Sequence, residues 1–148
     1  ASEYNGLRAG IATEPASMDY IARLPDDPNA SPSGPQPETM EVNTMEMKAA
    51  ALIEARGRID TSLAMERVNA VEMPILVISR QRDHNRATFR LNYELLEEAG
   101  KDVEWKEYDH DYHGFFFIER NAAGQYDPDP VQTEAVEYAI SYFSRYLK

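Results

Sequence analysis

The strongest strand signal in the chain is the apolar run Ile75-Leu-Val-Ile, which lies within residues 73–79. Pro74 stands near its start, where a sheet tolerates a missing N–H donor. An unbroken run of branched apolar residues is typical of a strand that is covered on both faces, as strands of parallel sheets are. Residues 73–79 therefore favour a parallel sheet that is covered on both faces.

Strand and helix signals alternate along the rest of the chain. We predict a buried strand over residues 7–13 and a strand nearer a sheet edge over residues 103–108, where apolar and polar residues alternate. The predicted helices cover residues 39–58, 61–68, 86–99 and the segment after Asp129. This order implies parallel strands joined by right-handed crossovers. The predicted fold class is therefore a layered parallel sheet with flanking helices, in one domain spanning residues 1–148.

Several residues mark where the predicted helices begin and end. Thr61 or Ser62 can cap the second helix, and Gly100 can stop the third. Asp129 can cap the last helix, and Pro130 suits its first turn. We expect the buried face of this last helix to carry Val136, Ala139, Ile140, Phe143 and Leu147.

Residues 24–38 hold five of the nine prolines of the chain. No helix or central strand can run through that density of missing N–H donors, so the segment is predicted to be a long surface loop. A solvated connector is the first interpretation, and a lid over a site is the second.

The composition limits the kinds of partner. The formal net charge of −11 argues against nucleic-acid binding and against adsorption to anionic membranes. No apolar run reaches the roughly 20 residues that cross a bilayer, and no signal peptide is visible. The chain has no cysteine, which excludes disulfides, thiolate zinc sites and a cysteine nucleophile. Cytoplasmic, periplasmic and secreted locations all stay open.

Two polar residues follow predicted strands in a way that suggests catalysis. Asp83 follows the strand of residues 73–79, and His113 follows that of residues 103–108. In open parallel sheets, catalytic groups gather at the carboxyl ends of the strands. A carboxylate that orients a histidine, which then moves the proton of a nucleophile, is the working part of a catalytic triad. Glu14 follows the first predicted strand and is a further candidate.

These segments resemble the C-terminal third of serine α/β-hydrolases, and most of all the dienelactone hydrolase and prolyl oligopeptidase group. The resemblance rests on Pro-Ile-Leu-Val-Ile with Asp83 five residues on, on the helix that ends Glu-Ala-Gly-Lys, and on His-Gly-Phe at His113. It implies that Asp83 is the triad acid and His113 the general base. It extends upstream through Asn5-Gly-Leu-Arg-Ala-Gly and through residues 61–74, and is weakest over residues 24–57.

No segment matches the nucleophile of that family. None of the eight serines stands in a G-x-S-x-G turn: Ser2, Ser17, Ser31, Ser33, Ser62, Ser79, Ser141 and Ser144. The resemblance therefore implies the C-terminal portion of an esterase or peptidase, inactive alone, whose nucleophile lies on a missing N-terminal segment or on a partner chain. It implies a small ester or peptide substrate and no cofactor. The sheet edge left unpaired could also lead to self-association.

Arg80 and Asn85 depart from the family pattern, which usually has a small and an apolar residue there. Arg80 could crowd the loop or reach toward an anionic substrate, and with Glu14 it completes the predicted substrate-binding residues. His84 and His110 are expected to be solvated loop residues, and Phe115-Phe-Phe to belong to the core.

The chain has three alternative interpretations. A metal cluster in residues 109–113 is disfavoured, because ligands spaced two or three apart on a tight loop point apart, and no metal site is predicted. A non-catalytic α/β binding or interaction module would retain Asp83 and His113 by descent only. A phospho-acceptor regulator would need an acidic cluster after its first strand, which Ile-Ala-Thr-Glu14 does not provide.

Overall fold

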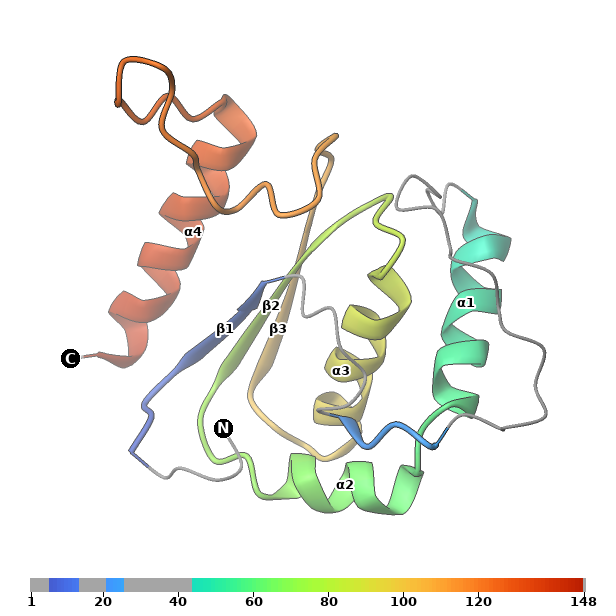
Figure 1. Cartoon of the computed structure of the whole chain (residues 1–148). Coiled ribbons are helices and arrows are strands. Elements are labelled where there is room, and N and C mark those ends of the chain that lie inside the picture. Colours follow the sequence, from blue (N-terminus) through green and yellow to red (C-terminus); the bar gives the residue numbers. More distant parts are fainter. Residues whose placement is uncertain (1–5, 14–20, 26–43, 148) are drawn as a thin grey trace.

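The described part of the chain comprises residues 6–13, 21–25 and 44–147 of the computed structural model. In chain order its elements are β1 (Gly10–Thr13), α1 (Met45–Gly57), α2 (Thr61–Asn69), β2 (Ile75–Arg80), α3 (Arg86–Glu98), β3 (Val103–Tyr108) and α4 (Pro130–Tyr146) (Figure 1). Glu14, residues 26–38 of the proline-rich segment and residues 39–43 of the first predicted helix lie outside the described residues.

The three strands form one parallel sheet in the order β1-β2-β3. Ile75 of β2 is the common point of the register, since it lies opposite Gly10 of β1 and Val103 of β3. Every residue of β2 is buried, as the apolar run predicted, and β3 is an edge strand of this sheet. The predicted fold class, a layered parallel sheet with flanking helices, is confirmed.

The prediction that residues 7–13 form a buried strand is wrong in extent and in burial. The strand is confined to Gly10–Thr13, and its four residues are only half-buried. The physical reason is its position, because β1 pairs with β2 on one side and with none of the described residues on the other. A mostly apolar sequence is compatible with either a central or an edge strand.

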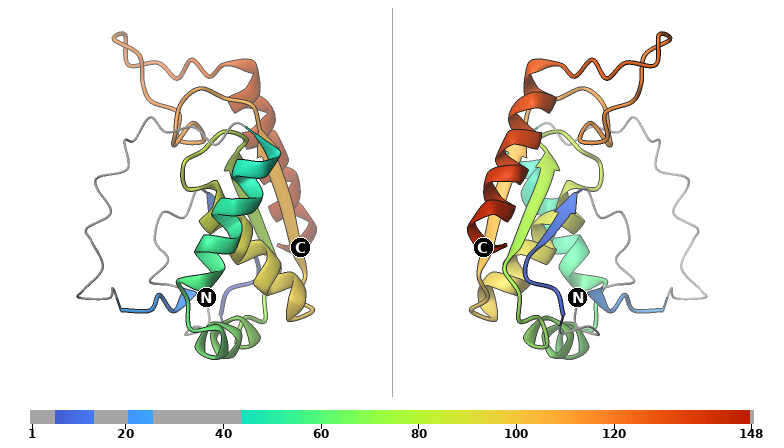
Figure 2. Two further views of the ribbon diagram at one scale, coloured as in Figure 1. Left: turned by 90° about the vertical axis from the view of Figure 1, so that its right-hand side faces the viewer. Right: turned by 90° about the vertical axis from the view of Figure 1, so that its left-hand side faces the viewer.

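Helices cover both faces of the sheet, and β2 supplies alternate side chains to each. Leu76 and Ile78 pack in the cluster of α4, whereas Ile75 and Val77 pack in that of α3, as the two-residue period of a strand requires. A third cluster joins α1, α2 and α3: Ile21, Ala22, Ala55, Ile59, Ala64, Leu91 and Leu95. Figure 2 shows α1 and α3 on one side of the sheet and α4 on the other.

The buried face of α4 agrees with the predicted one at Ala139 but not at Ile140 or Leu147. Ala135, Ala139 and Tyr142 face the core, whereas Ile140 and Leu147 are 61% and 58% exposed. Two alanines one turn apart let the helix approach the sheet closely, and Tyr142 fills the space beyond them. Apolarity alone favoured Ile140 and Leu147, whereas the observed helix is rotated so that Ala135 and Tyr142 face the sheet instead.

The helix ends follow the predicted capping chemistry in two of three cases. Asp129 caps α4 through a reciprocal capping box with Gln132, and Gly100 follows α3 with a φ of 67°. The predicted caps of α2 are wrong, because Asp60 accepts the N–H of Leu63 and the helix starts at Thr61. None of the helices in the described residues is long and apolar enough to cross a membrane.

Candidate active site

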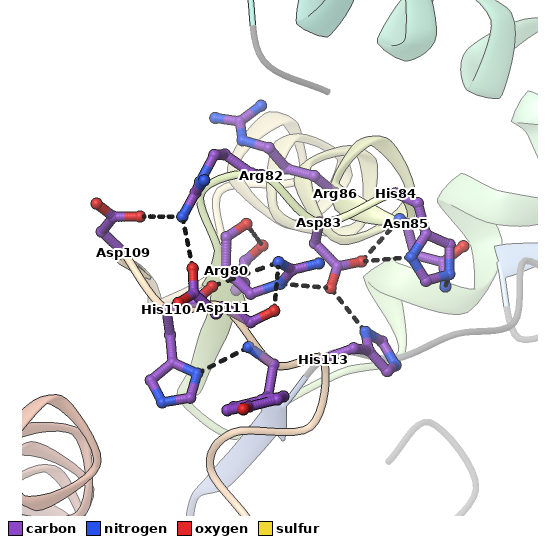
Figure 3. Close-up of polar contacts among 12 residues, drawn as sticks. Arg80, Arg82, Asp83, His84, Asn85, Arg86, Asp109, His110, Asp111 and His113 are labelled. Carbon is purple, nitrogen blue, oxygen red and sulfur yellow. Dashed lines mark hydrogen bonds and ion pairs between the residues drawn. The ribbon is translucent and has the colours of Figure 1, made fainter. Parts of the chain in front are cut away.

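Asp83 and His113 lie on the loops that follow the carboxyl ends of β2 and β3, and they meet there (Figure 3). The distance between Asp83 Oδ2 and His113 Nδ1 is 2.6 Å. Because an ionised carboxylate can only accept, the His113 Nδ1–H donates, and in the neutral ring the lone pair is then on Nε2. The Asp83 side chain is fully buried, while that of His113 is 41% exposed.

Hydrogen bonds inside the protein stabilise the negative charge on Asp83. The backbone N–H of Asn85 donates to Oδ1 at 2.7 Å. Burial by itself raises the pKa of the Asp83 carboxyl, but the hydrogen bonds from His113 and Asn85 outweigh it, and the pKa is lowered from its ordinary value. The arrangement is thus a buried anion that orients a solvent-accessible imidazole.

Arg80, the last residue of β2, is buried beneath the two loops. Its Nε lies 3.4 Å from Asp83 Oδ2, and its Nη1 donates to the carbonyl oxygens of His110 and Asp111 at 3.3 and 3.1 Å. One side chain therefore contacts both the carboxylate and the loop that carries His113. These contacts point the guanidinium into the protein interior, so the geometry fits a positioning role better than the predicted contact with substrate.

His110 is not the solvated loop residue that the sequence suggested, because the folded chain buries it. Its Nδ1 accepts the backbone N–H of Tyr112 at 3.0 Å, so Nε2 carries the proton and donates to Asp129 Oδ2 at 2.7 Å. The ring also stacks on Phe115, with 5.0 Å between centroids. His110 thereby ties the His113 loop to the N-terminus of α4, through a partner 19 residues away that no local pattern could indicate.

His84 also departs from the expected solvated state. Its side chain is 19% exposed, its Nε2 lies 3.0 Å from Asn85 Nδ2, and its ring centroid is 5.2 Å from that of His113. The prediction that Phe115-Phe-Phe belongs to the core holds for Phe115 and is wrong for Phe117, which is exposed.

A surface hollow lies beside the acid–histidine pair without including it. Its lining residues are Arg82, Asp109, His110, Asp111, Tyr112 and Asp129. Arg82 bridges Asp109 and Asp111 at 3.1 and 3.0 Å. The hollow is therefore lined by residues 109–112, which directly precede His113 in the loop after β3.

No serine within the described residues hydrogen-bonds to His113. The buried Ser79 donates to the carbonyl of Arg80, and Ser144 donates to the carbonyl of Ile140 within its own helix. Asp83 and His113 thus form a hydrogen-bonded acid–histidine pair, and no serine hydroxyl of the described residues completes it.

Comparison with known proteins gives a distant structural likeness. No family model matches the chain, and no curated protein matches it. Three solved structures of a thermophilic esterase from the Planctomycetes species Thermogutta terrifontis are similar, each with a TM-score of 0.49. The butyrate-bound form shares 17% identity over 93% of this chain and 43% of its own. The native form shares 18% over 93% and 42%, and the propionate-bound form 17% over 98% and 47%. The chain spans less than half the length of these esterase chains.

Proposed function

We propose that this chain is the C-terminal part of a serine hydrolase of the α/β-hydrolase superfamily, in which Asp83 is the triad acid and His113 the general base. One observation carries the proposal. A fully buried carboxylate and an exposed imidazole lie 2.6 Å apart, each on the loop after one of two adjacent parallel strands. That edge of a parallel sheet is where catalytic groups are placed in open α/β folds.

The chemistry follows from the hydrogen bond. With Nδ1–H donated to Asp83, the Nε2 lone pair of His113 takes the proton of a nucleophilic hydroxyl as it attacks an ester or amide carbonyl. Asp83 stabilises the imidazolium that forms, and its lowered pKa keeps it ionised for that task. The imidazolium then protonates the leaving group, and a water molecule activated by the same Nε2 hydrolyses the acyl-enzyme.

The nucleophile belongs, in this proposal, to a segment that pairs with the edge of β1 to which none of the described residues pairs. A parallel strand added there would end at the same rim of the sheet as β2 and β3, which brings a residue in the following turn toward His113. The segment is N-terminal to this chain or lies on a partner chain. Self-association through the same edge is the competing use of β1.

The substrate is an ester or a peptide, as in the dienelactone hydrolase and prolyl oligopeptidase group that the sequence resembles. Glu14 stays a prediction for the substrate pocket, since it follows β1 directly but lies outside the described residues. Arg80 acts in this proposal as a positioning residue, because its guanidinium contacts Asp83 and the His113 loop.

A fluorophosphonate probe tests the proposal on the protein in the assembly in which it is isolated. Intact-mass analysis should find the label on a polypeptide other than residues 1–148, or on a longer form of this chain. Absence of label on every polypeptide present would contradict the proposal and favour a non-catalytic interaction module.

Two variants test the roles of the acid and the base. Asp83→Asn should reduce labelling and ester turnover by about 10⁴-fold, the loss known for the equivalent change in a serine protease, because the amide favours the wrong histidine tautomer. His113→Ala should reduce them at least as much. Asp109→Asn is the matched control, an exposed aspartate at the other end of the His113 loop, and should change turnover by less than about 3-fold. Equal turnover of the Asp83 and Asp109 variants would refute the triad assignment.

A further inference from the structure

Three side chains of metal-binding type converge at the rim of the sheet, next to the proposed acid and base. Asp83, His84 and His113 each offer one ligand atom, and these atoms all lie within 4.8 Å of one another. His84 Nδ1 is 3.8 Å from Asp83 Oδ1 (Figure 3). This group draws on the loops after both β2 and β3, which is why the sequence, searched for closely spaced ligands, gave no sign of it.

His84 is the member of this group that the proposed triad leaves unexplained. Its Nε2 accepts from the Asn85 side chain, so in the neutral ring Nδ1 carries the proton. That Nδ1 is buried and has no hydrogen-bond partner among the described residues, since 3.8 Å to Asp83 Oδ1 is too long for a hydrogen bond. A buried nitrogen that faces a carboxylate at this distance leaves room for a cation between them.

We propose that Asp83, His84 and His113 bind Zn²⁺ or a similar borderline divalent transition metal, with water as the remaining ligand. Two imidazoles and one carboxylate are the donor set that zinc takes in open, three-ligand protein sites. Tetrahedral ligands about 2.1 Å from zinc are roughly 3.4 Å apart, so a spacing of up to 4.8 Å must close by up to about 1.4 Å. The side chains of His84 and His113 are 19% and 41% exposed and can make that movement.

The residues around the three ligands favour a bound cation, with the exception of one positive charge. When His84 binds a metal through Nδ1, its Nε2 carries the proton. A rotation of the Asn85 amide then lets Asn85 Oδ1 accept that N–H, and metal-bound histidines usually make such a second hydrogen bond. The Asn85 N–H already holds Asp83 Oδ1 in place. Arg80 lies on Oδ2 and repels a cation, so the site binds zinc more weakly than a structural zinc centre does.

Zinc at this site inhibits the hydrolase. This consequence rests on the proposed function, whereas the site itself does not. If His113 binds the metal through Nε2, the lone pair that takes the nucleophile's proton is consumed. If it binds through Nδ1, the hydrogen bond to Asp83 is lost. In both cases His113 no longer acts as general base, and a chelator that removes the metal restores it.

The test begins with direct binding, because the chain has only three histidines. ZnCl₂ is titrated into the metal-free protein at neutral pH, and the imidazole resonances are followed by NMR. The resonances of His84 and His113 should shift together. Those of His110 should not, because both of its nitrogens are engaged by Tyr112 and Asp129. No saturable shift, or an equal shift of all three histidines, would overturn the site.

The zinc affinity of variants, measured by calorimetry, is a second test. His84→Ala should weaken zinc binding at least about 10-fold, and Asp109→Asn should leave it unchanged. Should His84→Ala not fold, His84→Gln replaces it. Zinc affinity that survives loss of the His84 ring would contradict the proposal.

The activity measurement separates this inference from the proposed function. In an active preparation, zinc should lower ester turnover and EDTA should restore it, with the inhibition constant raised in parallel by His84→Ala. Zinc binding, with no fluorophosphonate label on any polypeptide of the assembly in which the chain is isolated, would refute the proposed function and leave the site standing. Hydrolase activity without zinc binding would do the reverse, and activation by zinc would refute the inhibitory role.

Discussion

Arg80 offers a sharp test of how the loops of the candidate site are held. The change Arg80→Met keeps most of the length of the side chain and removes the guanidinium. It leaves the fully buried Asp83 without its cation at 3.4 Å, and it removes the Nη1 donor from the carbonyls of His110 and Asp111. Each of these groups lies at the rim that the proposed chemistry requires.

The magnitude follows from burial. Removing one partner of a buried ion pair costs about 3–5 kcal/mol, because the remaining charge stays desolvated. That is a large part of the roughly 5–15 kcal/mol by which a domain is stable. For a chain of this size it corresponds to a fall in Tm of about 10 °C, since each kcal/mol is worth roughly 2–4 °C.

Arg82→Met is the matched control, made two residues away. Arg82 also contacts two acidic side chains, at 3.1 and 3.0 Å, but it is 37% exposed whereas Arg80 is 5% exposed. Solvent screening should limit its loss to about 1 kcal/mol or less. Urea unfolding of both variants at neutral pH measures the difference. An Arg80 variant no less stable than the Arg82 variant would refute the view that burial makes this contact strong.

Three further predictions concern stability. Asp129→Ala removes the cap of α4 and the partner of His110, and should lower the free energy of unfolding by about 1–2 kcal/mol in urea; no loss would show that the cap is replaced by solvent. Tyr142→Phe removes a buried hydroxyl that has no hydrogen-bond partner among the described residues, and should leave Tm unchanged or raise it. A clear fall in Tm would reveal a partner. The pKa values of Asp83 and Asp129 are lowered in the folded chain, so their stabilisation is full above the ordinary value of 3.8. It should be lost as pH falls below that value and through the lowered pKa, as Tm measured from pH 7 to pH 2 will show; a Tm independent of pH across this range would contradict both assignments.

Much of the fold could be predicted from local patterns. The apolar run of β2, the alternation in β3 and the Asp129-Pro130 start of α4 each specify an element, because they act within a few residues of the chain. Because β2 and β3 are parallel, Asp83 and His113 follow them at the same rim of the sheet, where 2.6 Å separates Asp83 Oδ2 from His113 Nδ1. Their catalytic role stays a proposal.

The predictions that were wrong depended on what lies across the fold. The face of α4 was misjudged in part, because Ala135 and Tyr142 are buried by close helix–sheet packing while Ile140 is exposed, and apolarity does not encode that packing. The half-burial of β1 reflects its position at the edge of the described sheet. Neither result is visible in the residues of the element itself.

The sequence by itself determined the alternation of strands and helices, the acidic surface, and the two loops on which an acid and a histidine stand. Only the tertiary structure decided what surrounds them. Arg80 reaches two carbonyls some 30 residues away, His110 finds Asp129, and His84 faces Asp83 without a hydrogen bond. Contacts of this kind arise when parallel strands bring distant loops to one rim. The sequence within a loop does not indicate which other loops will lie beside it in space.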